Sequence, residues 1–188
     1  MRNYLKNIKK NIDFVYKKNT TVLDENGRAI INMSVKSDDN FLSDFCNGDA
    51  PVISGRVSDF LENSYPNTSK PTPLTLKIKS DCIDEDEKII YKNAICDYYT
   101  DKYLANERHL KRNFIVAIIL GIVGLAVMAL ALILESAKES MLWVGFVDVV
   151  AWVFIWEFVD ILFFENYVLR LNRIRYLSFI DMLIEFVG

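Results

Sequence analysis

The chain has 188 residues, a hydrophobic fraction of 52% and a formal net charge of −3. This length leaves room for one small globular domain and a further short segment, and it excludes two sizeable globular domains. The charge is unevenly distributed: residues 1–18 have a net charge of +5, residues 19–101 have −7, and residues 114–134 carry none. The acidic balance excludes a nucleic-acid-binding protein, which needs a clustered basic face.

The first predicted element is a basic amphipathic helix over residues 2–18. Its apolar residues recur at helical spacing, with lysines on the opposite face. Two interpretations are open: the helix lies on an anionic membrane surface, or it packs on its own domain with a solvated lysine face. Lysines also interrupt any run of signal-peptide length, so the domain that follows is expected to stay in the cytosol.

Residues 19–85 predict a small cytosolic α+β domain. A β-hairpin is expected because two arms, residues 20–23 and 28–35, flank the Asn26-Gly27 step, which favours a tight turn. The domain's three cysteines lack the spacing of a metal or redox site and are expected to be reduced thiols. These cysteines are Cys46, Cys82 and Cys96. The remaining predicted elements of the domain are a third strand over 74–78 and short helices or turns at 37–47 and 58–63.

An acidic cluster over residues 81–87 precedes a predicted connecting helix, residues 86–113. Carboxylates at this position can cap the free N–H groups of the first helical turn. A calcium loop is the weaker interpretation, because the central glycine is missing and the ligand spacing is wrong. The helix is expected to enter the membrane without a break, and its predicted buried side consists of Ile90, Ala94, Ile95, Tyr98 and Tyr99.

Residues 114–164 predict a two-helix transmembrane hairpin. The first span, 114–134, has 21 uncharged residues; at ~1.5 Å each they reach roughly 31 Å, the thickness of a hydrocarbon core. The second span, 141–164, is also apolar but contains three carboxylates. Because only six residues separate the spans, the two helices are expected to run antiparallel.

The basic residues near the spans predict the orientation. Seven lysines and arginines flank the two outer ends of the hairpin, whereas the connecting loop has only Lys138. Both termini are therefore expected on the cytoplasmic side of a plasma or inner membrane. A C-terminal amphipathic helix, residues 165–188, is predicted either at the interface or docked on the connecting helix. The expected lipid-headgroup contacts are Lys111, Arg112, Arg170, Arg173 and Arg175.

The three carboxylates of the second span are Asp148, Glu157 and Asp160. An ionised carboxylate at such depth costs roughly 2.5–3.5 kcal/mol, and the first span offers no polar partner. Two interpretations are open: a cation-attracting or proton-bearing polar seam in an oligomer, or protonated acids hydrogen-bonded between packed helices. In the first span, the small residues Ala117, Gly121 and Gly124 predict close helix packing.

No enzyme signature is present, since His109 is the only histidine and a Ser-His-acid triad or histidine-based metal site cannot be built. We expect no catalytic, cofactor or metal site. The sequence favours a homo-oligomeric two-pass membrane protein, whose cytosolic domain senses a protein or small ligand and whose hairpin acts as a channel or membrane-perturbing effector. The alternative is a passive anchor or adaptor subunit of a larger complex.

Overall fold

The computed structural model describes residues 23–46, 50–66, 72–137 and 140–187. The predicted helix over residues 2–18 lies outside them. The chain divides into two compact units. The first comprises Met1–Tyr98 and Ser178–Gly188, and the second comprises Tyr99–Leu177.

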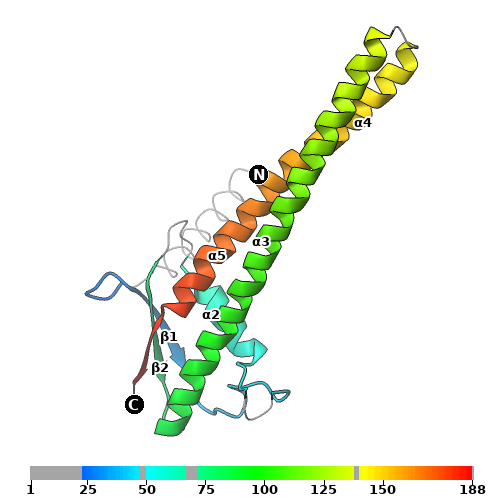
Figure 1. Ribbon diagram of the computed structural model, residues 1–188. Coiled ribbons are helices and arrows are strands. Elements are labelled where there is room, and N and C mark those ends of the chain that lie inside the picture. The colour runs from blue at the N-terminus through cyan, green and yellow to red at the C-terminus, as the bar shows by residue number, and fades with distance from the viewer. Residues whose placement is uncertain (1–22, 47–49, 67–71, 138–139, 188) are drawn as a thin grey trace, which may run out of the picture. The chain divides into compact units, whose positions relative to one another are not determined.

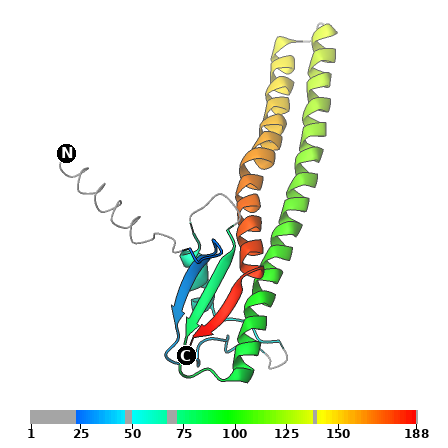
Figure 2. The same ribbon diagram turned by 90° about the vertical axis from the view of Figure 1, so that its left-hand side faces the viewer.

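The first unit is built on a parallel sheet of three strands in the order β1-β2-β3 (Figure 2). The strands are β1 (Ala29–Ser34), β2 (Leu74–Lys79) and β3 (Leu183–Val187). Helix α2 (Gly55–Ser64) connects β1 to β2, which makes a parallel crossover. The small domain is thus α/β with a parallel sheet, and the predicted α+β arrangement around a hairpin is corrected, because the third sheet strand comes from the far end of the chain.

The core of this unit lies on one face of the sheet, where α2 covers the strands (Figure 1). Strand side chains alternate between faces, so Ile31, Leu76 and Ile78 point to the same side, and each is at most 4% exposed. The described core of this unit also includes Val57 and Leu61 from α2 and Ala94 and Ile95 from the next helix. Ile90 was predicted to be buried there and is instead 41% exposed.

The predicted turn between residues 23 and 29 is confirmed. Gly27 has φ 75° and donates its N–H to the carbonyl of Asp24 at 3.0 Å, a left-handed conformation that glycine adopts without strain. Leu23 then pairs antiparallel with Ala29, and the rest of the predicted first arm lies outside the described residues. The predicted helix or turn at 37–47 consists of turns and one antiparallel bridge, Leu42 to Ile53, in its described part.

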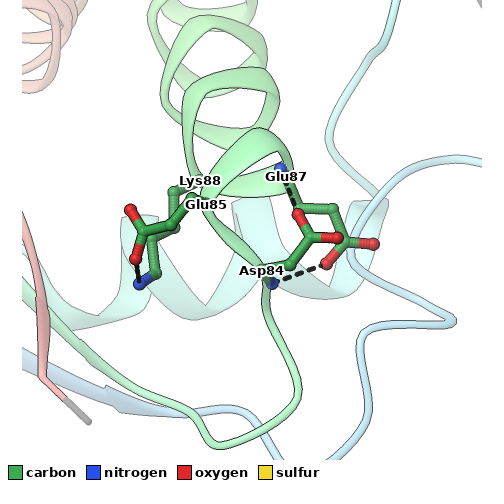
Figure 3. Close-up of polar contacts among 4 residues, drawn as sticks. All are labelled: Asp84, Glu85, Glu87 and Lys88. Carbon is green, nitrogen blue, oxygen red and sulfur yellow. Dashed lines mark hydrogen bonds and ion pairs between the residues drawn. The ribbon is translucent and has the colours of Figure 1, made fainter.

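Helix α3 (Glu85–Ser136) is a single helix of 52 residues, so the prediction that the connecting helix continues into the apolar segment is confirmed. Asp84 and Glu87 form a capping box at its start (Figure 3): the Glu87 N–H donates to Asp84 Oδ1 at 2.8 Å, and the Asp84 N–H donates to Glu87 Oε2 at 2.9 Å. Lys88 adds an ion pair with Glu85 at 2.6 Å. The acidic cluster therefore caps the helix, as predicted.

The second unit is an antiparallel pair of helices (Figure 2). One is the part of α3 from Tyr99 onward. The other consists of α4 (Met141–Val159), the π-helix η1 (Asp160–Glu165) and α5 (Asn166–Ile180) as far as Leu177. The predicted span 141–164 thus changes helix type at Asp160. The predicted C-terminal helix ends at Ile180 rather than at residue 188, because Leu183–Val187 pair with β2 as strand β3.

Among the described residues, α3 alone is long and apolar enough to be a candidate membrane-spanning helix. The apolar part of α3 follows Asn113 and continues to Leu134. The second helix of the pair does not qualify, and α4 is only 19 residues long and contains Asp148 and Glu157.

Candidate functional site

Small residues bring the two helices of the second unit close together. Ala117 is fully buried on α3, and Ala151 is fully buried on α4. A Cβ on Gly124 would lie 2.9 Å from Ile155 Cγ1 and 3.3 Å from the Ile155 backbone nitrogen. A Cβ on Gly121 would lie 3.1 Å from the Phe158 ring. The three residues predicted to pack helices all lie on the side of α3 that faces α4.

The outer surface of this pair is strongly apolar. Ile122 and Leu125 on α3 are 63% and 64% exposed, and Trp156 on α4 is 69% exposed. A contiguous apolar surface of this kind is uncommon on a protein that stays in water and is typical of a membrane or protein contact. Other exposed members are Ile115, Ile119, Leu132, Ile133, Phe146, Val149, Trp152, Val153, Phe163 and Phe164.

The three carboxylates of the predicted polar seam are not buried between α3 and α4. Asp148 and Glu157 are exposed, and Asp160 is half-buried at the first residue of η1. In the part of the chain that the structure describes, none of the three carboxylates has a hydrogen bond or ion pair. α4 turns its buried side, marked by Ala151, toward α3, so Glu157 points to the outside of the pair.

The π-helix was not predicted from the sequence. It begins at Asp160, where the backbone N–H is shared between the carbonyls of Trp156 and Glu157. One π turn changes the face on which the following residues lie, and such turns occur frequently at functional sites. A prediction that assumes a regular α-helix of 3.6 residues per turn as far as residue 164 therefore puts the residues after Asp160 on the wrong face of the helix.

A polar ladder joins the two helices beyond the apolar segment. Asn113 Nδ2 donates to Glu165 at 3.1 Å, and Asn106 Nδ2 donates to the Leu169 carbonyl at 2.9 Å. Glu107 forms an ion pair with Arg173 at 2.8 Å. None of these contacts was predicted from the sequence, and Arg173 was predicted to contact lipid headgroups. The only signal for them in the sequence is that two asparagines and a glutamate occur at residues 106–113, in the polar segment directly before the apolar one.

A basic surface follows the same end of the apolar segment. Arg108, His109 and Arg112 surround a shallow hollow of about 190 Å³, with Ala105 as its fourth lining residue. The Arg112 guanidinium lies 3.3 Å from His109 Nδ1. Of the predicted headgroup contacts, Lys111, Arg112 and Arg170 are exposed on this unit. Arg173 is also exposed and forms an ion pair with Glu107, and Arg175 is half-buried.

Among the described residues of the first unit, Tyr91 and Asp24 have shifted pKa values. Burial, and then a hydrogen bond to Asp38 at 3.1 Å, raises the pKa of the Tyr91 phenol well above its usual range. The pKa of Asp24 is lowered, chiefly by the N–H of Arg28, which donates to its Oδ1 at 2.8 Å. Both groups hold local structure together and carry no evident chemistry.

Cys46, Cys82 and Cys96 form no disulfide in the described part of the chain. Within the described ranges, no three histidine, cysteine or acidic side chains gather closely enough to hold a metal ion. Comparison of the chain with protein-family models, with curated proteins and with solved structures finds no match.

Proposed function

We propose that the chain is an integral membrane protein in which the α3–α4 pair crosses the bilayer twice, and that copies associate through α4. The first unit acts as a cytosolic sensing or interaction domain. The hairpins act as a channel or as a membrane-perturbing effector whose state depends on that domain.

The apolar outer surface of the α3–α4 pair carries this proposal. Large side chains such as Ile122, Leu125 and Trp156 are each more than 60% exposed, and water solvates such a surface poorly. The lipid chains of a bilayer would cover this surface and remove its unfavourable contact with water. α4 is short for a full crossing by itself, and the first residues of η1 extend the apolar segment to Phe164.

The exposed carboxylates support association of several copies. In hydrocarbon, a carboxylate at the depth of Glu157 needs a partner, water or a proton. The apolar part of α3 has no lysine, arginine, histidine, serine, threonine or asparagine that could donate a hydrogen bond to a carboxylate. Glu157 also points away from α3. A neighbouring copy would provide tryptophan N–H groups, a second carboxyl or a wet interior at this position.

The distribution of basic residues supports the orientation. Arg108, Lys111 and Arg112 precede the apolar part of α3, and Arg170 lies on the returning helix. Under the positive-inside rule this end is cytoplasmic. The first unit, which includes the predicted basic helix of residues 2–18, would then lie in the cytosol.

The test replaces both deep carboxylates, Glu157→Leu with Asp160→Leu, and measures oligomer size in detergent, membrane insertion and ion flux in liposomes. We expect normal insertion with loss of the oligomer, of ion flux, or of both. The matched control, Asp97→Leu with Asp101→Leu, removes two acids outside the apolar segment and should change none of the three.

Each outcome separates the proposed function from its alternative. Loss of flux with the oligomer retained identifies a conducting seam, and loss of the oligomer identifies a structural seam. If the double variant keeps both oligomer and flux, or if wild-type protein has neither, the hairpin is a passive anchor. If the wild-type protein can be extracted from membranes by alkaline carbonate, the two-pass topology is wrong.

A further inference from the structure

The open face of the sheet in the first unit carries a hollow of about 310 Å³. Its lining residues are Asn32, Met33, Ser34, Lys77, Lys79 and Val187, so all three strands contribute. In open parallel sheets, ligands commonly bind beyond the carboxyl ends of the strands. Ser34, Lys79 and Val187 are the last residues of their strands and place this hollow at that end.

The strand register places hydrogen-bond donors side by side. Asn32 lies opposite Lys77, and Ser34 lies opposite Lys79. Cross-strand neighbours on one face have Cβ atoms about 5 Å apart. Two ammonium groups, an amide and a hydroxyl therefore share a small surface, and each of them can donate a hydrogen bond to one anion.

The two lysines differ in their neighbours. Lys77 Nζ lies 3.7 Å from Glu185 Oε2, an ion pair without a short hydrogen bond. Lys79 is exposed and forms no ion pair within the described ranges. Glu185 therefore neutralises one of the two charges, and Lys79 retains its own.

This basic spot lies in an otherwise acidic region, since residues 19–101 carry eight basic and fifteen acidic side chains. Long-range electrostatics there repel anions, so binding must come from local donors. The apolar side chain of Val187, which is opposite Lys79 in the register, lines the same hollow, whereas Met33 is opposite Ile78 and points to the core. A ligand that matches both features combines phosphate oxygens with an organic group.

We propose that this hollow binds a small organic phosphate monoester, with the phosphate between Lys77 and Lys79 and the organic group against Val187. The proposal gives the ligand class of the sensing domain and in that respect rests on the proposed function. Binding itself does not require the membrane hairpin, so the two can fail separately.

The probes are AMP, inorganic phosphate and adenosine, titrated calorimetrically into full-length protein in a non-ionic detergent. We expect saturable binding of AMP, weaker binding of inorganic phosphate, and no binding of adenosine. Lys79→Gln should weaken AMP binding at least tenfold. The control, Lys92→Gln, removes an exposed lysine of the same unit and should leave the affinity unchanged.

A second pair of variants separates local contact from net charge. Glu185→Gln frees Lys77 and should tighten AMP binding, whereas Asp97→Asn makes the same charge change elsewhere on the unit and should have no such effect. The inference is overturned if wild-type protein binds no probe saturably, if Lys79→Gln binds AMP as wild type does, or if both acidic variants tighten binding equally. A protein that binds AMP but does not insert into membranes would refute the proposed function alone.

Discussion

Arg173 Nε lies 2.8 Å from Glu107 Oε1 and joins α5 to α3 within the second unit. The Glu107 side chain is 23% exposed and that of Arg173 is 48% exposed, so water screens the pair in part. We expect Glu107→Gln and Arg173→Gln each to destabilise the unit by about 0.2–1 kcal/mol.

A charge swap tests whether the contact itself matters. Combining Glu107→Arg with Arg173→Glu should recover most of the stability that either reversal loses, as measured by thermal unfolding in detergent at low salt. If the swapped protein is no more stable than the worse single variant, the two side chains do not interact in solution.

Gly124 is predicted to be the least tolerant glycine of the helix pair. A Cβ there would lie 2.9 Å from Ile155 Cγ1 and 3.3 Å from a backbone nitrogen, so α4 must move. Gly124→Ala should therefore destabilise the pair by about 1–3 kcal/mol through overpacking. Gly145→Ala is the control, because a Cβ at Gly145 meets nothing within 4 Å. It should be neutral or stabilising through its higher helix propensity. Equal thermal stability of the two variants would contradict the packing that places α4 against α3.

The capping box predicts a local effect at the start of α3. Asp84→Ala removes the acceptor for the Glu87 N–H and should cost about 1 kcal/mol. Amide hydrogen exchange of residues 85–90 should then accelerate, and that of the helix centre should not. Glu85→Ala, which removes only an exposed ion pair with Lys88, should have a much smaller effect. Unchanged exchange in Asp84→Ala would show that the cap contributes nothing.

Tyr91 predicts an alkaline limit to the stability of the first unit. Its folded-state pKa is raised above the ordinary value of 10.0, first by burial and then by Asp38. A raised pKa gives stability that is fully present below the unfolded pKa and is lost as pH rises toward the folded one. Wild-type protein should therefore lose more stability than Tyr91→Phe above about pH 10.

The measurement is thermal unfolding from about pH 8 to about pH 11.5. Below pH 10, Tyr91→Phe should be less stable by about 0.5–1.5 kcal/mol, because it lacks the hydrogen bond to Asp38 but keeps a ring against Phe41. Parallel pH profiles for the two proteins would show that the phenol ionises as freely when folded as when unfolded.

Short stretches of the sequence were enough to predict several secondary-structure elements of this protein. The uncharged segment of residues 114–134 predicted the apolar part of α3, because its composition is a property of one helix. The acids before residue 88 predicted the helix cap, and Gly27 predicted the turn, because both depend on neighbours within four residues. The alternation at Leu74, Leu76 and Ile78 likewise predicted β2.

The tertiary structure decided the elements whose partners are distant in the chain. Residues 183–187 are mostly apolar and fit either a helical or an extended pattern; they become β3 because the edge of β2 offers unpaired backbone groups to them. The same pairing makes the sheet parallel and places Val187 beside Lys79. Glu107 and Arg173 are 66 residues apart, and only the antiparallel packing of their helices brings the two charges together.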